Sequence, residues 1–63
     1  MKFSELMAFY DYKIINIVKK LKVSRETVKT WKEHNHIPFK SQCFIEVISH
    51  GELKANLDDF KSE

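Results

Sequence analysis

The 63-residue sequence contains very little glycine, proline and cysteine, with one residue of each. Hairpin turns between strands depend heavily on glycine and proline, so their scarcity argues against a strand-rich fold and favours helices joined by short loops. The single cysteine excludes an internal disulfide, which agrees with a reducing compartment.

Long apolar runs are missing as well. No stretch approaches the roughly 20 apolar residues that a membrane-spanning helix needs. Ser4, Glu5 and Asp11 interrupt the apolar N-terminal segment, so it does not resemble a signal peptide. We therefore expect an intact cytoplasmic protein with no membrane partner.

The sequence does contain enough apolar material for one small core. Apolar residues make up 43% of the chain and aromatic residues 13%, which argues against disorder. Residues 1–63 are therefore expected to form a single domain. A chain of this length buries only about 60% of its unfolded surface, so its stability should be a few kcal/mol.

Charge is unevenly distributed along the chain. Residues 13–32 hold seven basic residues and one acid, Glu26, whereas residues 41–63 hold two lysines and five acids. A basic central segment with an acidic tail favours a polyanionic partner such as nucleic acid. The alternative is that these lysines are simply the solvated faces of amphipathic helices.

The spacing of apolar residues predicts an all-α fold, a compact bundle of four to five short helices. The expected helices cover residues 5–10, 12–21, 25–33 and 40 or 41 to 49, with the remainder, residues 52–63, as one more short helix or a docked tail.

Caps and faces can be assigned to these expected helices. Ser4, Asp11 and Ser24 are the expected N-caps of the first three, because each side chain can accept from a free amide of the first turn. Gly51 is expected in left-handed geometry beyond the fourth. The fourth helix should bury a wide apolar face made of Phe44, Ile45, Val47 and Ile48.

Residues 14–33 are the segment around which the chain is organised. One helical face carries Ile14, Ile17, Val18 and Leu21, and one face of the next carries Val28 and Trp31. Helices this short cannot each bury a face alone, so the two must pack on each other. The second then presents polar and basic side chains on a short, rigid helix, a shape that fits the major groove of DNA.

This pattern resembles the helix-turn-helix of bacterial and phage repressors, whose buried positions fall here on Ile17, Val18, Leu21, Val23, Val28 and Trp31. The similarity continues through "VSRETVKTWKE", Ile37-Pro38, Glu46 and Gly51. Over nearly the whole chain the pattern is similar to the all-helical Cro repressors of lambdoid phages and the related YdaS-type repressors.

The resemblance implies a lambda repressor-like domain from a phage or prophage. Its expected function is to repress transcription by binding a palindromic operator in double-stranded DNA, with residues 25–33 in the major groove. A weak homodimer that forms on the DNA is expected, acting at the nucleoid of a bacterial host.

Two residues depart from the family pattern. The turn position that glycine usually holds is Lys22, which we expect to adopt a left-handed backbone at a cost of roughly 1 kcal/mol relative to glycine. The small alanine common at the contact between the two helices is replaced by Val18. The bulkier side chain is expected to open the helix crossing slightly.

The predicted base contacts lie on the exposed face of the helix at 25–33, and they are Arg25, Glu26, Lys29 and Thr30. Arg25 suits a forked bond to guanine, although a phosphate contact is the alternative. Base and phosphate contacts are equally open for Lys29. Glu26 could accept a hydrogen bond from cytosine N4, or its negative charge could instead stabilise the helix N-terminus through the helix dipole. Thr30 suits a thymine methyl group or a phosphate.

The predicted phosphate contacts are Lys13, Ser24, Lys32 and Lys40. Lys19 and Lys20 are expected to be solvated. The predicted dimer interface is a small apolar set in the C-terminal segment, consisting of Leu53, Leu57 and Phe60.

No catalytic, metal or cofactor site is expected, nor a small-molecule ligand. His34 and His36 lie in a loop without carboxylate or cysteine neighbours, which makes a poor metal site. No nucleophile has an identifiable base partner, and Gly51 alone cannot form a glycine-rich phosphate loop. Cys43 should be a small buried or interface side chain, and Trp31 should lie in the core rather than stack on a base.

A different class of function remains open. The acidic tail and the apolar residues Leu53, Leu57 and Phe60 also suit a protein-interaction module such as an antitoxin or anti-repressor. A prophage excision or architectural factor is a weaker alternative.

Overall fold

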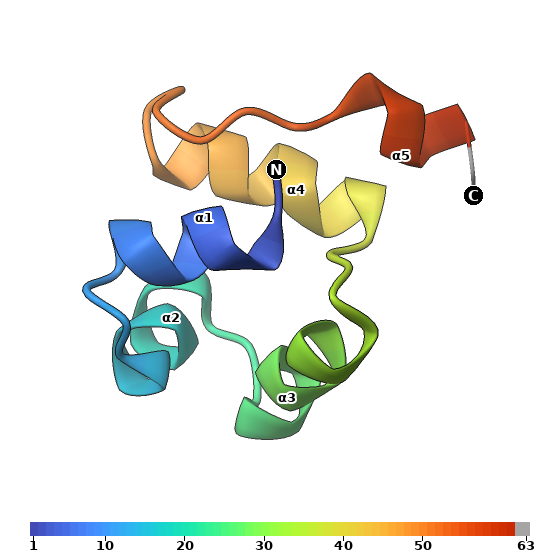
Figure 1. Ribbon diagram of the computed structural model, residues 1–63. Helices are drawn as coiled ribbons and strands as arrows, with labels where there is room; N and C mark the ends of the chain where they lie inside the picture. The colour runs from blue at the N-terminus through green and yellow to red at the C-terminus, as the bar shows by residue number, and fades with distance from the viewer. Residues whose placement is uncertain (62–63) are drawn as a thin grey trace.

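The computed structural model describes residues 1–61 and contains five α-helices and no strand within them (Figure 1). They are α1 (Phe3–Phe9), α2 (Ile14–Leu21), α3 (Arg25–His34), α4 (Phe39–Ile48) and α5 (Leu57–Lys61). The predicted all-α bundle is therefore confirmed. In this part of the chain, no helix has the length and apolar character needed to cross a membrane.

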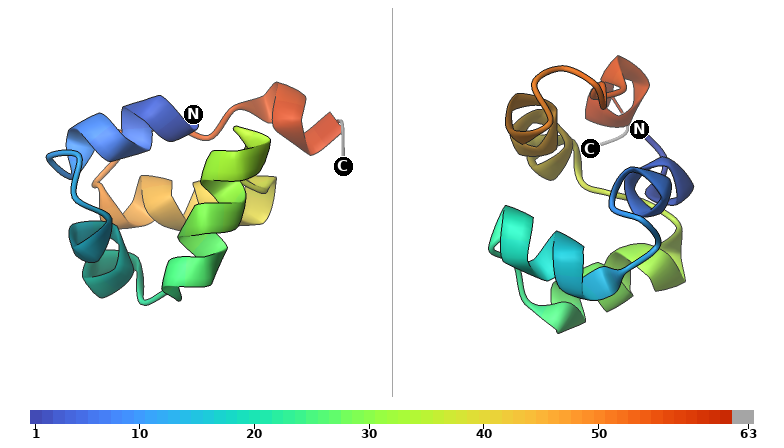
Figure 2. Two further views of the ribbon diagram at one scale, coloured as in Figure 1. Left: turned by 60° about the horizontal axis from the view of Figure 1, so that its bottom comes forward. Right: turned by 90° about the vertical axis from the view of Figure 1, so that its left-hand side faces the viewer.

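The helices form two layers. In Figures 1 and 2, α1 and α4 lie over the pair formed by α2 and α3, and α5 lies beside α4. One side chain from each of the first four helices and one from the α3–α4 loop fill the centre, and each is at most 1% exposed: Leu6, Ile17, Val28, Ile37 and Ile45. A single apolar core thus fixes the orientation of α3.

The first two helices begin at residues other than the predicted caps. Lys2 is the N-cap of α1, where the Glu5 carboxylate accepts from the Lys2 amide at 3.0 Å, and Ser4 lies inside the helix. Lys13 is the N-cap of α2. Asp11 does not cap it, because Asp11 and Tyr12 both have a φ of 58° and form the turn between the helices.

Two aromatic rings lie at the end of α1, and one of them, Tyr10, belongs to the core. Phe9 and Tyr10 pack edge to face, with ring centroids 5.0 Å apart. Phe9 remains 37% exposed, whereas Tyr10 is 8% exposed. Desolvation by burial raises the pKa of the Tyr10 hydroxyl.

The α4 helix is less apolar on its inner side than predicted. Its fully buried residues are Gln42 and Ile45, while Phe44 is 47% and Val47 73% exposed. The expected wide apolar face was therefore wrong at Phe44 and Val47, because a polar side chain occupies the centre of the inner face. Cys43, expected to be buried or at an interface, is exposed.

Gln42 uses every hydrogen-bonding position of its amide. The oxygen accepts from the Met1 amino group at 2.7 Å and the Asn56 amide at 2.9 Å. The nitrogen donates to the Ile37 carbonyl at 2.7 Å and to Asp59 Oδ2 at 2.6 Å. One buried side chain thus connects the N-terminus, the α3–α4 loop and the C-terminal segment.

The chain after α4 returns along that helix. His50 and Gly51 both have positive φ, 57° and 81°, so the expected left-handed stop extends over two residues. The Leu53 amide then donates to Ser49 Oγ at 3.0 Å, and the Ala55 amide donates to Glu46 Oε1 at 2.8 Å. The segment is docked first and becomes helical only at α5.

Candidate nucleic-acid interface

A three-residue turn connects α2 to α3. Lys22 adopts left-handed geometry with φ 55° and ψ 43°, which confirms the expectation for this position. The chain then becomes extended at Ser24, with φ −76° and ψ 158°. Ile17 and Leu21 of α2 and Val28 and Trp31 of α3 are buried on either side of this turn. These are the features of a helix-turn-helix.

Ser24 caps α3 as predicted. Its hydroxyl oxygen accepts from the Thr27 amide at 3.1 Å and lies 2.9 Å from the Thr27 hydroxyl. Such a cap satisfies an amide that has no partner within the helix. It therefore fixes the point at which α3 starts and hence which side chains its outer face presents.

The four predicted base contacts lie together on α3. Arg25, Glu26, Lys29 and Thr30 are all exposed, and Val28 and Trp31 of the same helix are buried. In the left view of Figure 2, α3 is the foremost helix and no other helix covers it. The structure thus brings the predicted set onto one accessible helix.

Charges on this outer face are balanced. Arg25 and Lys29 are basic, and Glu26 and Glu33 are acidic. Lys29 Nζ lies 4.0 Å from Glu33 Oε1, but both side chains are well exposed, so the pair contributes little to stability. The outer face itself therefore carries no net charge from these four residues, and the surplus of positive charge lies on the lysines beside it.

Of the four predicted phosphate contacts, Ser24 is the exposed N-cap of α3, and the three lysines occupy different places in the fold. Lys13 is the N-cap of α2, Lys32 lies in the last turn of α3, and Lys40 lies in the first turn of α4. All three are exposed, as are Lys19 and Lys20 in the last turn of α2. Burial does not prevent any of them from reaching a ligand.

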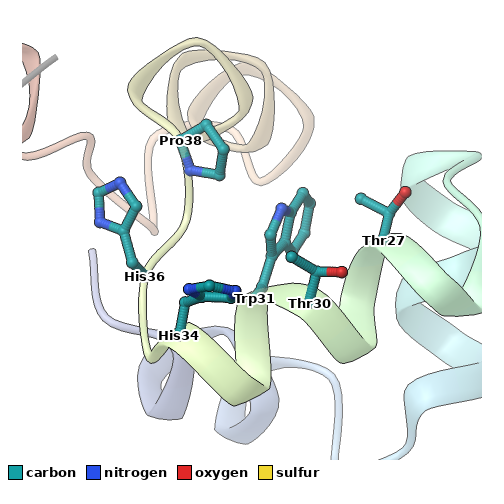
Figure 3. Close-up of a pocket in the computed structure, with 6 residues that line it drawn as sticks. All are labelled: Thr27, Thr30, Trp31, His34, His36 and Pro38. Carbon is teal, nitrogen blue, oxygen red and sulfur yellow. The ribbon is translucent and has the colours of Figure 1, made fainter.

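A recess of about 320 Å³ borders α3 on one side (Figure 3). The residues that line it are Thr27, Thr30, Trp31, His34, His36 and Pro38. Sequence reasoning missed this feature, because it forms only where the α3–α4 loop comes alongside α3. The spacing of Thr27, Thr30 and His34 on one ridge of the helix was the single signal available.

The predicted dimer interface needs correction at Leu53. This side chain is only 6% exposed and belongs to the core, because hydrogen bonding of its amide to Ser49 turns the chain inward. Leu57 and Phe60 are 69% and 62% exposed. The Phe60 ring packs against Phe39 of α4, with centroids 5.1 Å apart.

The structure also places the tryptophan and the two histidines for which the sequence made predictions. Trp31 is 4% exposed and lies in the core as predicted, which argues against stacking on an unpaired base. His34 is the last residue of α3 rather than a loop residue, and His36 lies in the α3–α4 loop. Residues 1–61 include no group of three or more histidine, cysteine, aspartate or glutamate side chains that could hold a metal ion.

Comparisons with protein-family models, with curated proteins and with solved structures returned no significant match.

Proposed function

We propose that this protein is a sequence-specific DNA-binding repressor of the Cro type, with α3 as its recognition helix. The observation that carries the proposal is the geometry of residues 14–34. Two short helices meet at a left-handed Lys22, and α3 is capped by Ser24 and held by buried Val28 and Trp31. A rigid helix with an uncovered polar face is what major-groove reading requires.

The positions of the basic residues support separate roles in base reading and in phosphate contact. Arg25 and Lys29 read base edges, while Lys13, Lys32 and Lys40 contact phosphates on either side. Glu26 and Glu33 offset the positive charge of the outer face. Sequence specificity is therefore expected to depend on Arg25 and Lys29, and overall affinity on the lysines that contact phosphates.

Dimerisation on DNA would use Leu57 and Phe60. In Figures 1 and 2, α5 lies beside the start of α4, and both side chains are exposed. Two apolar side chains are far short of a standard interface of about 1,600 Å². A dimer of this kind would form only when the operator holds two copies together.

The test is selection of bound sites from a pool of random DNA duplexes at fixed salt. Wild type should enrich a palindromic consensus with half-sites about one helical turn apart. Arg25→Ala should lose the preference at one base position per half-site, worth about 1–3 kcal/mol. Lys20→Ala is the matched control, because it removes one exposed charge from α2 and should leave the consensus unchanged.

Two results would count against the proposal. A pool that never enriches would reduce the basic surface to non-specific attraction. A consensus that Arg25→Ala and Lys20→Ala alter equally would remove α3 from sequence reading.

A protein-interaction module is the second candidate. It is favoured by the exposed apolar residues of α4, Phe44 and Val47, which neither the core nor the proposed DNA surface uses. For such a module, Arg25→Ala combined with Lys29→Ala should leave function intact. Changes at the exposed apolar residues Phe44 and Val47 should abolish it, whereas the DNA-binding proposal expects no effect there.

A further inference from the structure

The recess beside α3 is more apolar than its residue types suggest. It includes two threonines, whose hydroxyls would normally make such a surface polar. The Thr30 hydroxyl donates to the Glu26 carbonyl at 3.0 Å within α3. The Thr27 hydroxyl lies 2.9 Å from that of Ser24. Both hydroxyls are therefore engaged inside the helix and its cap.

The methyl groups of the two threonines are left to face the recess. In Figure 3 the methyl carbon of each lies toward Trp31, and each hydroxyl oxygen lies on the opposite side. Thr30 is exposed, whereas Thr27 is half-buried, so Thr30 presents the more accessible methyl group. The indole of Trp31 and the ring of Pro38 continue the apolar lining.

The position and charge of the recess suit nucleic acid. Thr30 lies on the same exposed helix as Arg25 and Lys29. None of the six lining residues is acidic, although two glutamates lie on the adjacent outer face. The only apolar group that a DNA duplex presents in its major groove is the 5-methyl group of thymine.

We propose that Thr30 reads a thymine through its methyl group, with the recess receiving the 5-methyl edge of that base. This inference rests on the proposed function and deepens it, because it names the base and the atom that is read. Thr30 then donates no hydrogen bond to DNA, since its hydroxyl proton remains bonded to the Glu26 carbonyl. Recognition of this thymine therefore depends on an apolar contact rather than on a charged group.

The experiment starts from the operator selected above. Each thymine of one half-site is replaced in turn by deoxyuridine, which removes only the 5-methyl group, and the Kd is measured at fixed salt. For wild type, one position should weaken binding by about three- to fivefold, the effect of one buried methyl group.

Two variants of the protein identify the partner of that methyl group. Thr30→Ser keeps the hydroxyl and loses the methyl group, so its affinity should no longer depend on that thymine methyl. Thr30→Val keeps a methyl group and loses the hydroxyl, so the dependence should persist. Because residue 30 is exposed, both variants should fold, and thermal unfolding followed by circular dichroism verifies this.

The possible outcomes separate this inference from the proposed function. An enriched consensus whose thymines all tolerate deoxyuridine would overturn the inference and leave the repressor proposal intact. Equal sensitivity in wild type and Thr30→Ser, or its loss in Thr30→Val, would also overturn it. A pool without enrichment would overturn both.

Discussion

The helix-turn-helix and the C-terminal segment of this protein are anchored by different kinds of contact. Residues 14–34 are held by apolar side chains at helical spacing, with Ile17 and Val28 fully buried. Residues 49–61 bury one apolar side chain, Leu53, and are otherwise held largely by hydrogen bonds to two side chains of α4, Gln42 and Glu46. Apolar contacts tolerate small shifts, whereas a buried amide needs each partner in place.

The two kinds of contact position two different surfaces of the protein. The apolar contacts fix α3 against α2 and so define the surface proposed to read DNA. The polar contacts of Gln42 bring α5, with its exposed Leu57 and Phe60, next to the start of α4. We therefore expect that the C-terminal segment can be disrupted while the helix-turn-helix remains folded.

The largest effect is expected from the apolar region. Trp31→Ala should destabilise the fold by about 3–5 kcal/mol, which is the usual cost of removing a buried aromatic side chain. Because a chain of this size has a stability of only a few kcal/mol, the variant should be largely unfolded at 25 °C. Phe60→Ala is the matched control, since that ring is 62% exposed and its loss should cost far less. Urea unfolding followed by circular dichroism measures both.

The second effect is expected from the polar region. Gln42→Leu leaves the Met1 amino group, the Ile37 carbonyl and the Asn56 amide without their partner. An unsatisfied buried group costs about 1–3 kcal/mol, but release of the C-terminal segment into water should limit the total to about 2–3 kcal/mol.

Hydrogen exchange locates the damage in that variant. The Asn56 and Ala55 amides should lose protection, and the amides of α3 should remain protected as an internal control. Equal loss of protection in α3 would show that the two regions are not separable.

The smallest effect concerns the turn. Lys22→Gly should stabilise the protein by up to about 1 kcal/mol, because glycine adopts the left-handed geometry seen at this position without steric cost. The gain in the unfolding midpoint should appear without a change in DNA specificity. A loss of stability would mean that the stem of Lys22 makes contacts outweighing the relief of backbone strain.

The sequence predicted the helix-turn-helix better than any other part, and the reason is physical. Its signals are local: apolar residues at i, i+3 and i+4, a serine before the helix, and a turn of fixed length. The buried positions Ile17, Leu21, Val28 and Trp31 and the cap at Ser24 were anticipated on this basis, and the left-handed Lys22 from the family resemblance.

The remaining features depend on partners distant in sequence. Glutamine is a residue type usually found at the surface. Gln42 is buried because it forms hydrogen bonds with Met1, 41 positions away, and Asp59, 17 positions away. The same burial displaces Phe44 and Val47 outward, and the docking of the tail through Ser49 turns Leu53 inward. The recess beside α3 likewise requires the α3–α4 loop to be in place.

The most direct test of the central proposal is an NMR titration of the ¹⁵N-labelled full chain. The titrant is first a short mixed-sequence DNA duplex at low salt and then the selected operator. We expect the largest amide shifts in residues 25–34 and around Lys13 and Lys40, with the exposed side of α4 around Val47 unaffected. Shifts concentrated on α4 and α5, with α3 unchanged, would contradict DNA reading by the helix-turn-helix.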